Sequence, residues 1–186
     1  MAKLYTKNGD NGETFLLFGK KVSKLDARVQ CYGAIDECIS NLGAAYSLSV
    51  EKNDKDISDL ILKIQRTLFI ISSEIACPTE KYNDLKEKYK YIDEEVITDL
   101  EKKIDKYQSI TPKINYFVLP GGSLISSFID IARTSCRRSE RLCVEVRDLS
   151  QLNNKNILIY LNRLSDLLFI LARYIDRDKE YLRATE

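Results

Sequence analysis

The stretch that decides the fold is Phe117–Arg141, which reads FVLPGGSLISSFIDIARTSCRRSER. A Pro-Gly-Gly-Ser break precedes a long run with helical spacing, so we expect a helix that begins near residue 122. One face of this helix is apolar and should pack in a core. Its members are Ile125, Phe128, Ile129, Ala132, Cys136, Leu142, Cys143 and Val146.

A second face of the same helix carries positive charge. Arg133, Arg137, Glu140 and Arg141 fall at i, i+4, i+7 and i+8, so they form one stripe that borders the apolar face. We call these four residues the arginine stripe. Guanidinium groups present a planar fork of donors that suits phosphate oxygens. The stripe therefore indicates an anion site, with a solvated charged face as the alternative interpretation.

The composition limits the kinds of partner. The 29 Lys and Arg residues nearly balance the 28 Asp and Glu residues, whereas a nucleic-acid-binding domain is usually strongly basic, so we expect no nucleic-acid partner. The N-terminus lacks the apolar stretch of a signal peptide, and no apolar run is long enough to cross a membrane. We therefore expect a cytoplasmic protein, folded as one domain over residues 1–186.

The absence of histidine restricts the chemistry further. The five cysteines include no CxxC pair, so we expect no metal site made by the protein. Catalysis by a Ser-His or Cys-His pair is excluded. The reaction must need little proton transfer, or must take its reactive atom from a cofactor.

Apolar spacing predicts an all-α protein behind an irregular N-terminal arm at residues 1–24. Residues 25–177 should form the helical body. Residues 79–92 are charged with weak periodicity, which predicts a mobile surface connection, and the charged tail at 178–186 should fray. The expected helices are 26–49, 55–76, 93–109, 122–147 and 154–176.

The arm contains a glycine-rich turn, YTKNGDNGET at residues 5–14. Gly9 and Gly12 allow backbone N–H groups to turn toward a phosphate, while Thr6 and Thr14 could donate from the sides. Lys24 could reach back to the turn as a point charge. The alternatives are an ordinary tight turn and a lysine that serves only solubility.

Two polar residues fall where apolar residues belong. Asp36 shares a helix face with Val29 and Ile39, so we expect it inside the packing seam and paired, with Arg133 as the candidate partner. A purely structural salt bridge is the alternative. Asn162 lies beside Leu161 in the last helix, where a hydrogen-bonded packing amide is the alternative to a ligand contact.

Five blocks in order resemble a known family. They are YTKNGDNGET, VSKLDARV, YGAIDE, FVLPGGS with ARTSCRRSER, and YLNRLSDLLFILARY. Over residues 5–174 the chain is similar to the ATP:cob(I)alamin adenosyltransferases of the propanediol-utilisation type. The resemblance implies a five-helix bundle, assembled as a homotrimer that binds ATP and the corrinoid between subunits.

The resemblance also implies a reaction that suits this composition. Cob(I)alamin would attack the 5′ carbon of ATP, bound with Mg²⁺, and give adenosylcobalamin and triphosphate without a protein base. A flavoprotein reductase would act on cob(II)alamin, and a B12-dependent enzyme would take the product.

Specific residues follow from the matched blocks. Arg137 would stabilise the departing triphosphate. Phe117 would lie below the corrin ring, displace the lower ligand and favour four-coordinate Co(II). Asp36 and Arg133 would form a salt bridge between subunits. The residues implied to bind ATP are Thr6, Lys7, Asn8, Gly9, Thr14, Phe15, Lys24, Arg137, Arg138, Ser139, Glu140, Arg141 and Asn162.

The sequence departs from the family pattern at two positions. Asn8 stands where the family often has Thr, and Asp130 stands where many members carry His. Two other classes of function compete with the enzyme: a non-catalytic ATP-binding helical sensor, and a trimeric interaction protein whose stripe is only an interface. Phe117 favours the enzyme, because a protein that only binds ATP has no use for an aromatic ring below cobalt.

Overall fold

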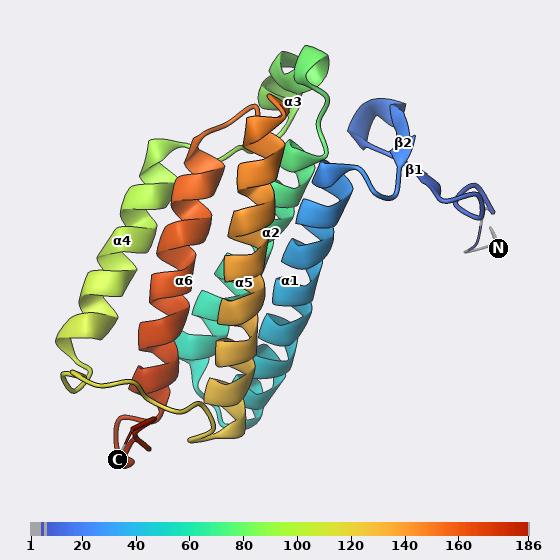
Figure 1. Ribbon diagram of the computed structural model, residues 1–186. Coiled ribbons are helices and arrows are strands. Elements are labelled where there is room, and N and C mark those ends of the chain that lie inside the picture. Colours follow the sequence, from blue (N-terminus) through green and yellow to red (C-terminus); the bar gives the residue numbers. More distant parts are fainter. Residues whose placement is uncertain (1–4, 6, 186) are drawn as a thin grey trace.

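The computed structural model describes residues 5 and 7–185, and over these residues the protein is a bundle of long antiparallel helices (Figure 1). Each long helix ends within two residues of its predicted limits, which confirms the all-α class and the five-helix bundle. The long helices are α1 (Ala27–Glu51), α2 (Lys55–Ile75), α4 (Glu94–Ser109), α5 (Leu124–Asp148) and α6 (Asn156–Ile175).

Capping side chains fix where four of these helices begin. Asp26, Asp54 and Asp93 each accept a hydrogen bond from a backbone N–H in the first turn of α1, α2 and α4. Ser123 caps α5 in a capping box with Ser126. The Pro-Gly-Gly-Ser break therefore ends in a cap, and α5 begins two residues later than predicted.

The predicted apolar face of α5 packs against α1 and α6. Ile125, Ile129, Ala132, Cys136, Cys143 and Val146 are buried, and Phe128 and Leu142 pack against them from the edge. The thiols are free and buried, as expected for cysteines that act as small apolar residues.

The surface connection expected at residues 79–92 contains more regular structure than its weak periodicity indicated. This segment contains a short helix, α3 (Tyr82–Lys88), after a 3₁₀ turn at Thr79–Lys81. The Leu85 and Ile92 side chains are buried. The apolar pattern did not predict this helix, because the two buried residues are seven positions apart and only Leu85 lies in α3.

The tail does not fray over the residues described here. Arg183 forms a β-bridge with Val118, and the backbone N–H groups of Leu119 and Ala184 donate to Leu182 and Phe117 at 2.8 Å. The tail therefore pairs with the segment that leads into α5, and the prediction from its charged composition is wrong.

The N-terminal arm is partly regular. Strands β1 (Glu13–Phe15) and β2 (Lys21–Ser23) form an antiparallel pair, with a 3₁₀ turn at Leu17–Gly19 between them. The Leu17 N–H donates to the Ala76 carbonyl at 3.0 Å, and the Leu16 side chain is buried. These contacts hold the arm at the end of the bundle where α1 begins, while the α4–α5 segment and the tail occupy the other end (Figure 1).

None of the helices in the described residues has the length and apolar character needed to span a membrane.

Candidate functional site

The arginine stripe lies on α5 as predicted, beside the buried face. Arg137 and Arg141 are exposed, whereas Arg133 and Glu140 are half-buried. Arg141 donates to the Arg137 carbonyl at 3.2 Å. In the described part of the chain no carboxylate lies within ion-pair distance of Arg137, so its guanidinium is available to an anion.

Glu140 and Asn162 come together from α5 and α6. The Asn162 side-chain amide donates to Glu140 Oε1 at 2.9 Å, and its oxygen accepts from Arg163 at 2.8 Å. Arg163 Nε in turn donates to Glu101 Oε1 at 3.2 Å. The amide thus has partners on both sides, which fixes its orientation at the edge of the stripe.

The two residues after Arg137 differ in their surroundings. Arg138 forms an ion pair with Glu37 of α1 on the surface. Ser139 is fully buried, and its hydroxyl donates to the Ser135 carbonyl at 2.9 Å. Ser139 therefore contributes to the packing of α5 and is not open to a ligand within this chain.

The expected position of Asp36 is wrong. Asp36 is exposed, because the buried face of α1 is formed by neighbouring positions that include Ile35 and Cys38. Within the chain Arg133 pairs instead with Asp130, whose Oδ1 accepts from Arg133 Nε at 3.0 Å. The Asp36–Arg133 pair does not form inside one chain.

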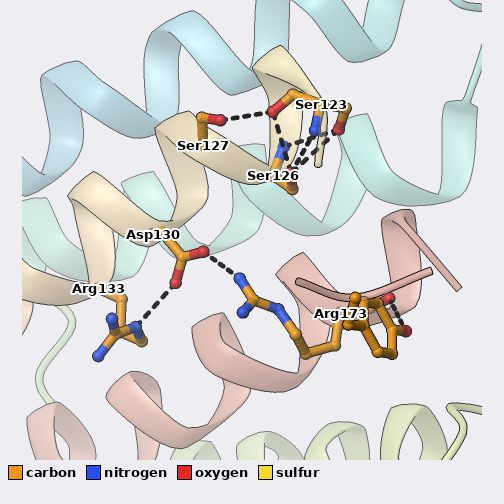
Figure 2. Close-up of polar contacts among 7 residues, drawn as sticks. Ser123, Ser126, Ser127, Asp130, Arg133 and Arg173 are labelled. Atoms are coloured by element: carbon orange, nitrogen blue, oxygen red, sulfur yellow. Dashed lines mark hydrogen bonds and ion pairs between the residues drawn. The ribbon is translucent and has the colours of Figure 1, made fainter. Parts of the chain in front are cut away.

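Asp130 is the centre of a buried polar cluster (Figure 2). The residue is 3% exposed and also accepts from Arg173 of α6, which is equally buried. One turn earlier on α5, the Ser127 hydroxyl donates to the Ser123 carbonyl at 2.7 Å. Sequence reasoning missed Arg173, although a charge inside the apolar run FILARYI was a signal for a buried ion pair.

The glycine-rich turn and Lys24 meet in the arm. The Lys24 N–H donates to the Gly12 carbonyl at 2.8 Å, and a Cβ at Gly9 would lie 3.2 Å from Lys24 Nζ. Lys7 and Asn8 are exposed beside this turn. The lysine does reach back, so the turn carries a cation at its edge.

Two further arm residues, Thr14 and Phe15, lie in strand β1. Thr14 is half-buried in β1, and the Phe15 side chain is 49% exposed. Thr6 lies outside the described residues.

Phe117 is 81% exposed, in the segment between α4 and α5. Next to this segment is a cavity of about 620 Å³ between α4 and α6, which sequence reasoning missed because it depends on the path of residues 111–115. Its lining includes Ile104, Gln108, Asn115, Asp166, Phe169 and Ile170.

The described residues contain no group of three or more His, Cys, Asp or Glu side chains that could hold a metal ion. Acidic side chains are abundant, but they are paired with arginines and lysines or spread over the surface.

Comparisons with known proteins agree with this arrangement. A family model for cobalamin adenosyltransferases matches residues 4–175. The corrinoid adenosyltransferase of Bacillus subtilis is 39% identical, over 98% of this chain and 93% of its own length. The human corrinoid adenosyltransferase is 38% identical, over 92% of this chain and 68% of its own.

Solved structures give the same result. A variant PduO-type ATP:corrinoid adenosyltransferase from Lactobacillus reuteri, complexed with cobalamin and ATP, matches with a TM-score of 0.88 and 34% identity, over 99% of this chain and 100% of that one. Another variant from the same organism, complexed with ATP, matches with a TM-score of 0.84 and 35% identity, over 97% and 99% of the two chains. The chain therefore belongs to the cobalamin adenosyltransferase family.

Proposed function

We infer that the protein is an ATP:corrinoid adenosyltransferase, which transfers the 5′-deoxyadenosyl group of ATP to cob(I)alamin. The observation that carries this inference is the match, over 99% of the chain, to a solved relative that holds both cobalamin and ATP. The arginine stripe and the glycine-rich turn support it, because each offers cationic groups at a surface that a triphosphate can reach.

The reaction needs little from the protein beyond position and charge. The Co(I) centre of the substrate attacks the 5′ carbon of ATP, and a Co–C bond forms as the C–O bond breaks. Triphosphate leaves with the electron pair of that bond. No proton moves at the reacting carbon, so the chain can do this chemistry without histidine.

The exposed guanidinium of Arg137 is placed to stabilise the charge on the departing triphosphate. The Glu140–Asn162 pair at the edge of the stripe would orient the nucleotide, with Arg138 and Arg141 nearby. Mg²⁺ would be bound together with the phosphates of ATP.

The arm would close over the nucleotide with Lys7, Asn8, Gly9 and Lys24. Thr6, Thr14 and Phe15 complete the proposed set. Phe117 would support the lower face of the corrin ring, and its high exposure leaves the ring free for that contact.

We propose a homotrimer whose sites lie between subunits. The arm and the segment that holds Phe117 are at opposite ends of the bundle, and α5, at 25 residues, spans roughly 37 Å between them. One chain cannot bring both to adjacent substrates, whereas two chains can. Exposed Asp36 and half-buried Arg133 would then pair across the interface.

Light scattering tests this assembly with Asp36→Asn, Arg133→Ala and the double variant. Arg133→Ala should weaken association by about 3 to 5 kcal/mol, because it leaves the partner's Asp36 unpaired in the interface. Asp36→Asn should cost less, because Arg133 keeps its bond to Asp130, and the double change should cost less than the sum. Three fully trimeric and active variants would show that the pairing is wrong.

The proposal includes the setting of the enzyme. Residues 1–186 act as one domain in the cytoplasm, with an ATP-binding arm at 1–24, a bundle at 25–177 and a tail at 178–186. A flavoprotein reductase supplies electrons for cob(I)alamin, and a B12-dependent enzyme receives the product.

A spectral assay tests the activity directly. Chemically reduced cob(I)alamin is mixed with ATP, Mg²⁺ and the protein, and conversion to adenosylcobalamin is followed by its absorption spectrum. The proposal expects conversion that depends on both ATP and the protein. ATP binding without any spectral change would favour the non-catalytic sensor instead.

A further inference from the structure

The Asp130 cluster contains more positive than negative charge. Both oxygens of this one carboxylate are occupied: Oδ1 accepts from Arg133 Nε at 3.0 Å, and Oδ2 accepts from Arg173. Two guanidiniums share a single carboxylate, so the cluster keeps one surplus positive charge. The surplus must be directed toward a further anion or toward water.

The two arginines play different parts. The Arg173 side chain is 4% exposed, and its guanidinium lies 5.3 Å from the centre of the Phe169 ring, so it is held inside the bundle. The Arg133 side chain is 24% exposed. The buried Arg173 is therefore the inner partner of Asp130, and Arg133 carries the surplus charge to the surface.

Arg133 is held through its Nε atom. Asp130 contacts its Nε, three residues earlier on the same helix, and within residues 5 and 7–185 the two terminal nitrogens of Arg133 have no hydrogen-bond partner. A guanidinium fixed through Nε keeps a free pair of donors in one orientation. Such a pair matches a carboxylate or a phosphate.

We propose that Asp130 is a positioning residue. It holds Arg133 in one rotamer so that the terminal nitrogens meet Asp36 of the partner subunit, and Arg173 binds the other oxygen of the same carboxylate from inside the bundle. This inference rests on the trimer of the proposed function. It also gives Asp130 a role at its position in α5, because a carboxylate there orients Arg133 from inside the bundle.

The test is a double-mutant cycle read by sedimentation equilibrium of the full chain. Asp130→Asn should raise the subunit dissociation constant roughly 10- to 100-fold, the range known for residues that orient metal ligands through a hydrogen bond. Arg133→Ala should raise it at least as much. The double variant should be no weaker than Arg133→Ala alone, because Asp130 acts through Arg133.

A merely structural role predicts a different result. If Asp130 served only to join α5 to α6, its replacement would weaken association by the same factor whether or not Arg133 is present, and additive losses would overturn the proposal. The matched control is Asp148→Asn, which breaks an exposed pair with Arg147 on the same helix and should leave association unchanged.

A second variant separates the positioning role of Asp130 from a failure to fold. Asp130→Asn strands the buried Arg173, so the variant Asp130→Asn/Arg173→Gln, with a neutral interior, is measured beside it. It should fold by circular dichroism and still associate weakly, and parent-like association would overturn the proposal. The measurement needs no substrate, so an inactive but trimeric parent protein would count against the proposed activity alone, whereas a monomeric parent would overturn the positioning role.

Discussion

Two buried carboxylates at opposite ends of the bundle are satisfied in different ways. Glu74, at the end of α2 near α3, is 1% exposed and accepts from the Tyr82 hydroxyl and the Ile92 N–H at 2.7 Å and from the Asn154 amide at 2.9 Å. Asp130, near the start of α5, is 3% exposed and accepts from two guanidiniums.

The difference shows that one buried carboxylate organises the backbone and the other orients a charged side chain. Neutral donors fix the path of the chain around Glu74, and that path presents the Ala76 carbonyl and Glu80 to the arm. The arginines at Asp130 leave a surplus charge at the surface. Hydrogen bonds from neutral groups organise a backbone, whereas excess guanidinium groups prepare a site for a ligand or a partner.

The largest effect on activity should come from a change in the arginine stripe. Arg137→Ala should lower kcat about a hundredfold or more, roughly 3 kcal/mol of transition-state stabilisation, because the departing triphosphate loses a cation. Its free energy of unfolding should not change, since the side chain is exposed and unpaired. Turnover at saturating ATP measures the effect, with Arg147→Ala on the same helix as control, and near-normal turnover would reject the triphosphate role.

A change in the cluster around Glu74 should instead lower stability and leave activity intact. Glu74→Ala should lower the free energy of unfolding by about 2 kcal/mol, because the Ile92 N–H and the Tyr82 hydroxyl lose their acceptor in a buried place. Activity per folded molecule should be kept at low temperature. Urea unfolding measures the loss against Glu87→Ala, an exposed glutamate of α3, and equal stability of the two variants would contradict the comparison.

The cluster around Glu74 should also make the stability of the protein depend on pH. Burial raises the pKa of Glu74 above its ordinary 4.5, although the bonds from Asn154, Tyr82 and Ile92 oppose this. A raised folded pKa gives stability that is fully present below the unfolded pKa and is lost as the pH rises through the folded value. The stability of the parent relative to Glu74→Gln should therefore fall between pH 4.5 and neutral. A flat difference would mean that the pKa of Glu74 is ordinary.

Phe117 lies outside both clusters and should have the smallest effect on nucleotide binding. Phe117→Ala should change ATP affinity by less than about threefold, roughly 0.7 kcal/mol, because the ring is exposed and belongs to the α4–α5 segment, at the end of the bundle opposite the arm. Titration calorimetry measures this affinity.

The same variant should alter the cobalt centre. Electron paramagnetic resonance of cob(II)alamin with ATP should show a four-coordinate signal in the parent and not in the variant. Equal signals in both proteins would show that Phe117 does not displace the lower ligand.

The sequence predicted those features that depend on helical periodicity. The five long helices and the stripe beside the buried face of α5 follow from regular spacing over many turns. Asp36 was misplaced because several faces of α1 contain small or apolar residues, so periodicity did not distinguish the buried face. The predicted starts of α1, α2, α4 and α5 were close to correct, and an aspartate or serine cap lies just before each of these helices.

Features that depend on contacts between distant segments were not predictable in this way. The pairing of the tail with residues 117–119 joins two charged or irregular stretches, and neither shows a strand pattern. The Asp130–Arg173 pair joins α5 to α6 through two residues that are 43 positions apart in the sequence. The matched sequence blocks indicated most candidate site residues, but the partners that orient them required the packed structure.

The central claim is the transfer itself, and the most direct measurement is the ratio of its two products. Adenosylcobalamin is quantified by its spectrum and triphosphate by ion chromatography in the same reaction of ATP with chemically reduced cobalamin. The account predicts that triphosphate and adenosylcobalamin appear in equal amounts, at the same rate, and only with the protein present. Formation of ADP and phosphate, or loss of ATP without a new Co–C bond, would contradict it.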